Sequence, residues 1–395
     1  MGERVDFEER AAMCALNRIF GFEPRIGMSL TDIFGSASEV IGAGREELEA
    51  ALGAYSRSRY LPQITESAFE SAAMELERLE REGCSFICFG EPGYPALLAE
   101  CEDPPLGLYF KGISKPEDVF GGAPAVSVVG TRDLTSYGKE WGVRIVEAMS
   151  RSRSSSRPLV VSGLALGVDS VAHRSALDGG LPTVAVMATG IDSIYPSSNR
   201  ALAERIVETP GCALVTDYPP GTDAIRINFL RRNRIIAGIG RATILVESKV
   251  RGGGMMTARL AVSYGRDVFA LPGRMDDPAS QGCNMLIREN LAEPVGEMGE
   301  FMARLGLGLA RMATKEDFKG EVKAFYEGKA EGSLLDDAVS MAREIKARRG
   351  ISLDELCIKL GWDFGRTSQV AAMLECDGFI EIDLLQHCSA AVRRN

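Results

Sequence analysis

The chain lacks the short motifs of several enzyme classes. It has no Gly-x-x-x-x-Gly-Lys-Ser/Thr loop, so ATP hydrolysis of the P-loop kind has no machinery here. It has no Gly-x-Gly-x-x-Gly with an acidic residue after the next strand, which leaves a dinucleotide-dependent dehydrogenase unsupported. It has no Gly-x-Ser-x-Gly elbow and only two histidines, so a serine hydrolase is not indicated either.

Features of metal, disulfide and membrane proteins are also scarce. The nine cysteines are scattered, and the one close pair, Cys84 and Cys88, has no second pair or histidine near it. No run approaches the roughly 20 apolar residues of a membrane span. The acidic start at Met1 has no signal-peptide core. We therefore expect a cytoplasmic protein with reduced thiols and no metal or cofactor.

Acidic residues outnumber basic ones, and the formal net charge is −10. This balance argues against nonspecific coating of nucleic acid. It leaves room for a local basic groove, because charges at a surface act over about 8–10 Å.

Six short apolar runs are each followed by a Gly- or Arg-marked turn and then by a helical pattern. Strand–helix alternation predicts an α/β fold with a parallel sheet, and ligands bind such sheets beyond the carboxyl ends of the strands. The unusual residues of the chain all follow these runs. The predicted strands are residues 125–129, 159–162, 183–187, 212–216, 243–246 and 268–271.

We divide the chain into four parts. Residues 1–65 are predicted to form short helices separated by glycine turns, similar to helix-hairpin-helix or SAM domains, and to serve either packing or DNA contact. Residues 66–305 form the sheet core, and the charged residues 306–335 form a linker. Residues 336–395 show the helix, turn, helix, strand order of a winged helix.

Two features of the final part suggest its role. Ser352 begins a capping box that opens its first helix. The second helix starts with Arg366, which suits phosphate contact, although winged helices also dock proteins. DNA contact and protein contact both stay open for this part.

Several turns at the predicted sheet edge suit anion binding. Gly130-Thr131-Arg132 combines free backbone amides with a guanidinium, and Gly163 and Gly167 allow a ligand to approach closely. Residues 228–234 put three arginines and Phe229 at one turn, and arginine with an aromatic ring is typical of single-stranded nucleic-acid sites.

Each of these residues also has a purely structural interpretation. Arg232 and Arg234 are equally explained by salt bridges to Asp169, Asp192, Asp217 or Glu247. His173 is predicted to be a packed helical residue rather than a catalyst. Helix capping alone would also account for four further residues: Asn199, Thr257, Ser280 and Asn284.

The motifs in these turns resemble those of the DNA-processing protein family DprA, also called Smf. The resemblance covers the whole core and rests on specific strings. They are Val129-Gly130-Thr131-Arg132, Ser162-Gly163-Leu164-Ala165-x-Gly167-Val168-Asp169, Tyr195-Pro196, Tyr218-Pro219-Pro220-Gly221, Arg232-Asn233-Arg234-Ile235-Ile236-Ala237-Gly238, Thr257-Ala258, Val268-Phe269-Ala270-Leu271-Pro272-Gly273 and Ser280-x-Gly282-x-Asn284.

The resemblance implies an extended Rossmann-like core that binds single-stranded DNA without catalysis. It further implies a homodimer that protects incoming strands and loads the RecA recombinase on them during natural transformation. By motif position, Arg132 binds phosphate and the ring of Phe229 stacks on a base. The predicted nucleic-acid-binding residues are Gly130, Thr131, Arg132, Gly163, Leu164, Gly167, Phe229, Arg231, Arg232, Asn233, Arg234, Gly253, Gly254 and Thr257.

Three departures from the family pattern bear on this site. Leu230 replaces a proline, which loosens the turn that places Phe229, and Leu166 replaces a common lysine or arginine. Gly252-Gly253-Gly254 replaces Ser-Gly-Ser. The rival interpretation is a nucleotide-binding enzyme that hydrolyses nucleoside monophosphates, with Glu247 as its carboxylate.

Overall fold

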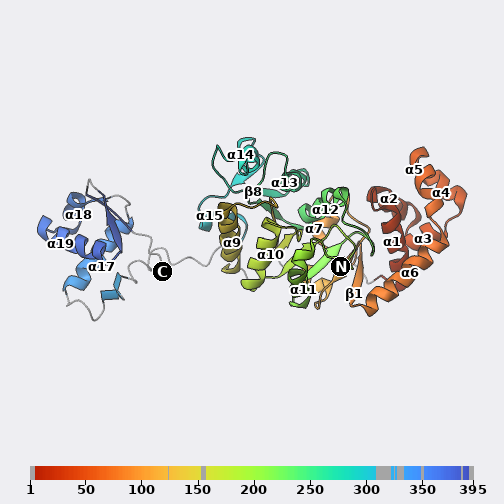
Figure 1. Ribbon diagram of the computed structural model, residues 1–395, viewed down its shortest axis with the longest axis horizontal. Helices are drawn as coiled ribbons and strands as arrows, with labels where there is room; N and C mark the ends of the chain where they lie inside the picture. The colour runs from red at the N-terminus through yellow and green to blue at the C-terminus, as the bar shows by residue number, and fades with distance from the viewer. Residues whose placement is uncertain are drawn as a thin grey trace. The chain divides into compact units, whose positions relative to one another are not determined.

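The computed structural model describes residues 5–122, 124–152, 157–307, 322–323, 325–326, 333–347, 351–383 and 386–390. The chain forms two compact units, Met1–Ala310 and Arg311–Asn395 (Figure 1). Within the described residues, no helix combines the length and the apolar character that crossing a membrane requires.

A nine-stranded, mostly parallel sheet forms the centre of the first unit. Neighbouring strands pair in parallel from β6 to β9, whereas β2 pairs antiparallel with both β1 and β6. The six predicted strands are therefore confirmed, each within one residue at either end. The order across the sheet is β1 (Cys84–Cys88), β2 (Gly107–Lys111), β6 (Ala213–Thr216), β5 (Thr183–Val186), β4 (Leu159–Ser162), β3 (Ala125–Val129), β7 (Ala242–Leu245), β8 (Asp267–Ala270) and β9 (Glu293–Pro294).

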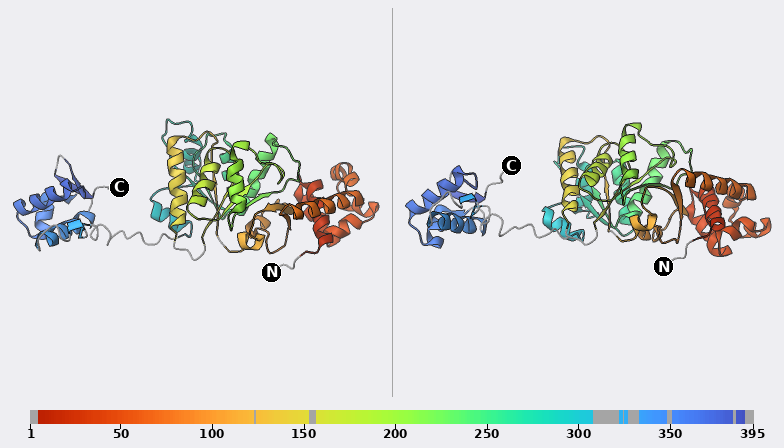
Figure 2. Two further views of the ribbon diagram at one scale, coloured as in Figure 1. Left: turned by 60° about the horizontal axis from the view of Figure 1, so that its bottom comes forward. Right: turned by 90° about the horizontal axis from the view of Figure 1, so that it is seen from below.

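Helices cover both faces of this sheet (Figure 2). One face packs against α9 (Ser136–Ser150), α10 (Val168–Asp178) and α15 (Met298–Arg304). Covering both faces explains why the core strands are apolar at consecutive positions. The other face packs against α7 (Ala96–Ala99), α8 (Pro116–Phe120), α12 (Arg226–Ile239), α13 (Gly253–Ser263) and α14 (Gln281–Arg288).

The N-terminal helices continue the hydrophobic core of the sheet. Leu16 and Phe20 of α1 belong to the same buried cluster as Cys88 of β1 and Tyr109 of β2. Helix α11 (Arg200–Glu208), which follows the 3-10 turn Ser197–Asn199, contributes to that cluster too. The helices are α1 (Phe7–Phe20), α2 (Pro24–Phe34), α3 (Ala37–Gly42), α4 (Arg45–Ala51), α5 (Ala54–Tyr60), the 3-10 turn Leu61–Gln63 and α6 (Glu66–Arg81).

The described residues of the second unit include helices α17, α18 and α19 and a small antiparallel sheet. Ser352 forms the predicted capping box with Glu355, and Gly361 ends that helix in the left-handed region at φ 67°. The winged-helix assignment itself stays a prediction, and most of the predicted linker lies outside the described residues. The elements are α17 (Ser333–Ala347), β10 (Ile351–Ser352), α18 (Leu353–Leu360), α19 (Phe364–Cys376), β11 (Ile380–Ile382) and β12 (His387–Ala390), with sheet order β10-β12-β11.

Candidate functional site

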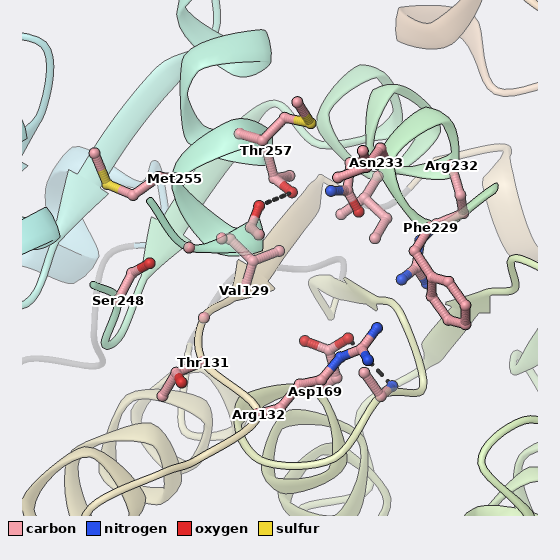
Figure 3. A pocket seen from close by; sticks show the side chains of 18 of the residues that line it. Val129, Thr131, Arg132, Asp169, Phe229, Arg232, Asn233, Ser248, Met255 and Thr257 are labelled. Atoms are coloured by element: carbon pink, nitrogen blue, oxygen red, sulfur yellow. Dashed lines mark hydrogen bonds between the residues drawn. The ribbon is translucent and has the colours of Figure 1, made fainter. Parts of the chain in front are cut away.

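The order of the parallel strands creates a crevice between β3 and β7. From β3 the chain winds outward through β4, β5 and β6, and it then returns to the other side of β3 with β7 and β8. Such a switch point leaves a crevice at the carboxyl ends of the two strands. A cavity of about 1090 Å³ lies there, lined by the loops after β3 and β7 and by α12 and α13 (Figure 3).

Two glycines bring the walls of this pocket together. A Cβ on Gly254 would lie 2.9 Å from Cα of Gly130 and 2.8 Å from Cδ1 of Leu245, so the start of α13 approaches the β3 loop only without a side chain. A Cβ on Gly253, one residue earlier, would have no atom within 4 Å. The replacement of Ser-Gly-Ser by Gly252-Gly253-Gly254 therefore allows the close packing of this pocket wall.

Glu247 secures the loop after β3. Its carboxylate accepts hydrogen bonds from the amide of Thr135 at 2.9 Å and from the hydroxyl of Thr135 at 2.6 Å, and its carbonyl accepts one from Thr131 at 2.7 Å. Glu247 is 1% exposed and does not line the cavity. It therefore positions the loop that carries Arg132.

Residues 228–234 belong to helix α12, so the expectation of a single turn is wrong. Residues on a helix advance by 100°, and positions i, i+3, i+4 and i+7 share a face. The pocket lining follows that spacing, with Arg226, Phe229, Leu230, Asn233 and Ile236, while Arg232 lies at its border. Leu230 stands inside the helix, which places Phe229 without a proline.

An aromatic and cationic group faces the mouth of the pocket. The guanidinium of Arg132 lies 4.8 Å from the ring centroid of Phe229, and Tyr195 meets the same ring edge-on at 5.4 Å. Figure 3 shows Arg132, Asp169 and Phe229 directed into one space. Arg132 and Phe229 are thus neighbours in the pocket, and their binding of a phosphate and a base stays a prediction.

Arg232 is buried in the pocket wall without full compensation of its charge. It is 3% exposed and donates from Nη1 to the carbonyl of Gly163 at 2.6 Å and to that of Val186, while its Nε has no partner. Burial lowers the pKa of Arg232, although Asp169 acts in the opposite direction. Burial likewise raises the pKa of Asp169, against the opposing charge of Arg232.

His173 of α10 is buried close enough to Arg232 to be affected by its charge, and its imidazole stays neutral. Burial, with a smaller contribution from Arg232, lowers the pKa of His173 to about 3. Its Nδ1 lies 2.8 Å from the hydroxyl of Thr183, which donates to the carbonyl of Val160. The imidazole therefore donates from Nδ1, and its Nε2 has no partner. This agrees with the prediction of a packed residue.

Arg231 and Arg234 lie on the other side of α12 and do not line the pocket. Arg234 pairs with Asp217 at 2.6 Å and also donates to the carbonyl of Asp103. Arg231 donates to the carbonyl of Gly21 and stacks over Phe22. Helix geometry turns both away from Phe229 and out of this pocket, and their contact with nucleic acid stays a prediction that the pocket does not support.

Three further predicted residues support the pocket without lining it. Gly167, at φ 75°, lets the β4 loop contact the loop of Thr131, and Leu164 is buried. A Cβ on Gly163 would lie 2.6 Å from both Cζ of Arg232 and Oδ2 of Asp169. Nine predicted residues do line the cavity: Gly130, Thr131, Arg132, Phe229, Arg232, Asn233, Gly253, Gly254 and Thr257.

Two residues for which helix capping was the structural interpretation hold loops instead. The side-chain amide of Asn199 donates to the carbonyls of Leu164 and Ala165, at 2.8 and 3.2 Å. Asn284 exchanges two hydrogen bonds with the backbone of Gly273. Both side chains therefore fix loops at the sheet edge.

Sequence reasoning missed four cations of the lining: Arg226, Lys249, Arg251 and Arg259. The spacing of three residues between Arg226 and Phe229 was a usable helical signal. The others sit in the loop and helix after β7, which meet the β3 loop only in the folded chain. Together with Arg132 and Arg232 they oppose a single lining carboxylate, Asp169.

The two other predicted DNA contacts are less suited to phosphate. In the hairpin between α3 and α4, the amide of Gly44 is bonded to the carboxylate of Glu47 at 2.9 Å. At the start of α19, Arg366 makes two bonds to Asp337, at 2.7 and 2.8 Å. Among the described residues, no group of three or more histidine, cysteine or carboxylate side chains could hold a metal ion.

Fold and site together define a class: an α/β protein with a mostly parallel sheet and a cationic pocket at its switch point. Residues 85–306 match the family model described as DNA recombination-mediator protein A. The chain belongs to this family, as the resemblance predicts.

Relatives and a solved structure agree with this membership. The chain is 38% identical to Protein Smf of Synechocystis sp. over 231 residues, which are 58% of this chain and 56% of that protein. It is 33% identical to the putative DNA processing protein DprA of Mycobacterium tuberculosis over 327 residues, 79% and 78% of the two chains. The X-ray structure of DNA processing protein A from Streptococcus pneumoniae matches with a TM-score of 0.63 at 26% identity, covering 76% of this chain and 98% of that one.

Proposed function

We propose that this protein binds single-stranded DNA in the pocket between β3 and β7 and catalyses no reaction on it. The charge of the lining supports the proposal above all. Six cations line the pocket together with one carboxylate, in a chain whose net charge is −10, and of these Arg259 also pairs with Glu289 at 3.6 Å. The six are Arg132, Arg226, Arg232, Lys249, Arg251 and Arg259. A cationic groove of this kind follows a phosphodiester backbone.

Selectivity for a single strand follows from the rings beside Arg132. The face of an unpaired base can stack on Phe229, and such stacking contributes about 1–3 kcal/mol per base. In a duplex the bases are stacked on one another and do not reach the ring. Buried Arg232, whose charge is not fully compensated, would be neutralised by a phosphate.

The finer role follows from family membership. We propose that the bound strand is protected and passed to the RecA recombinase during natural transformation or recombination, in the cytoplasm and by a homodimer. The family description as a recombination mediator supports this role. Because the match covers 56% of the Synechocystis relative, activity and partners of the whole relative are carried over only as proposals.

The test is fluorescence anisotropy with labelled oligo-dT and its duplex, for wild type, Arg132→Ala and the control Arg174→Ala. Arg174 is exposed on α10 outside the lining. We expect Arg132→Ala to weaken all single strands alike, by about tenfold at low salt, and to reduce the salt slope by about 0.7. Salt-independent binding, or equal binding of duplex, would contradict the proposal.

The rival function, hydrolysis of nucleoside monophosphates, needs an available carboxylate. Both oxygens of Glu247 face Thr135, which argues against that role. Incubation with nucleoside monophosphates checks it directly, since released base would identify an enzyme.

A further inference from the structure

Three exposed apolar side chains surround the cationic pocket. Tyr195, Val250 and Met256 all line the cavity, and they are 47%, 42% and 41% exposed. They come from three segments: the loop after β5, the loop after β7 and the first turn of α13. We call these three residues the apolar rim.

The rim alternates with the cations of the same segments. Val250 lies between Lys249 and Arg251, and Met256 precedes Arg259 by three residues on α13, so these two share a helix face. The pocket lining therefore presents exposed apolar side chains and cations together. An occupant that suits this surface carries regularly spaced negative charges and apolar flat groups beside them.

A single strand of nucleic acid has that composition. Its phosphates match the cations, and its bases offer an apolar face next to each phosphate. In a duplex, phosphates still reach the cations, whereas the paired bases are enclosed. The rim and the cations therefore act on different parts of the ligand.

We propose that the apolar rim contacts the unpaired bases next to the base on Phe229, and that this contact adds to the preference for single strands that Phe229 provides. The cations then set affinity and salt dependence, without distinguishing strand type. This inference rests on the proposed function and assigns part of its selectivity to Tyr195, Val250 and Met256.

The experiment compares Met256→Gln/Val250→Thr with the control Met275→Gln. Met275 is 92% exposed and lies outside the pocket lining. Three labelled probes of equal length are used: oligo-dT, an abasic oligodeoxynucleotide with the same phosphates, and a duplex. Gln and Thr keep about the size of the original side chains, and both positions are exposed, so the free energy of unfolding should change little.

We expect the double variant to bind oligo-dT about five- to tenfold more weakly, since part of one stacking contact is lost. Binding of the abasic strand and of the duplex should not change, and neither should the salt slope. Met275→Gln should match wild type on all three probes.

Other results overturn the inference in distinguishable ways. Equal losses on all three probes would show general damage to the pocket. Unchanged oligo-dT binding, with an altered molar mass in light scattering, would make the rim a contact between copies of the chain. If wild type binds no oligo-dT, the proposed function fails and the inference fails with it; wild-type binding that the double variant retains refutes the inference alone.

Discussion

The two sides of helix α12 use the same residue type for opposite purposes. On one side, Arg234 is 5% exposed and pairs with Asp217. Burial lowers the pKa of Arg234, but the charges of Asp217 and Asp103 outweigh burial, so the pKa is raised. On the other side, Arg232 is equally buried, yet burial prevails and the pKa is lowered. Compensation by neighbouring carboxylates, rather than burial, separates the two arginines, and only Arg232 lines the pocket.

Removing the compensated arginine should produce the largest effect. Arg234→Ala leaves Asp217, which is 4% exposed, as an unpaired buried carboxylate. We expect the free energy of unfolding to fall by about 3–5 kcal/mol, measured by urea denaturation. As a control, Arg226→Ala on the exposed pocket side should change stability by less than about 0.5 kcal/mol.

The comparison would fail if Arg234→Ala kept its stability and lost oligo-dT binding. Arg234 would then contact the ligand, and the assignment of the two faces would be reversed.

The pH dependence of stability tests the side of α12 that carries Arg232, because the charge of Arg232 acts on His173. Its pKa is about 3 in the folded chain, below the usual unfolded value of about 6.5. Its contribution to stability is therefore complete above pH 6.5 and is lost as the pH falls towards 3. The loss amounts to about 1.4 kcal/mol per pH unit, or about 2 kcal/mol at pH 5.

His173→Asn should reduce this acid sensitivity, because Asn takes up no proton in the unfolded chain. The Asn amide can also replace the Nδ1 donor towards Thr183. Unfolding free energies of both proteins, measured from pH 7.5 to 5, check the expectation. Parallel pH profiles would show that His173 takes up a proton in the folded chain.

Gly253 and Gly254, on the pocket wall opposite α12, offer a second comparison of two neighbouring positions. A Cβ on Gly254 meets Gly130 at 2.9 Å, whereas one on Gly253 meets nothing within 4 Å. We expect Gly254→Ala to cost about 1–3 kcal/mol and to weaken oligo-dT binding, as overpacking separates the two loops. Gly253→Ala should be neutral in stability, and thermal unfolding with anisotropy distinguishes the two variants. Equal effects would mean that the close approach of the loops is unimportant.

Adding a cation to the pocket side should have the smallest effect. Leu166 is 47% exposed and follows Ala165 of the pocket lining. Leu166→Lys should tighten oligo-dT binding about two- to threefold at low salt and increase the salt slope by up to about 0.7. The measurement is anisotropy across a salt series, with Met275→Lys as the control for added charge. A gain that Met275→Lys reproduces would reflect net charge rather than the site.

Much of the fold followed from local patterns in the sequence. Apolar runs between glycine turns predicted the six parallel strands, because hydrophobic periodicity and turn chemistry act over a few residues. The same patterns predicted that Gly130, Thr131 and Arg132 follow the first core strand. Helix ends at Ser352 and Gly361 were predictable for the same reason.

The sequence by itself determined the six core strands and which turns meet at one sheet edge, although it did not reveal that residues 228–234 are helical. Only the tertiary structure decided which charges line the pocket. Arg232 and Arg234 differ because α12 packs with one side towards the pocket and the other towards Asp217 and Asp103, the latter 131 residues away. The cations after β7 joined the site because β7 pairs with β3. Local propensity carries no information on such distant neighbours, and their charges determine the role of each buried arginine.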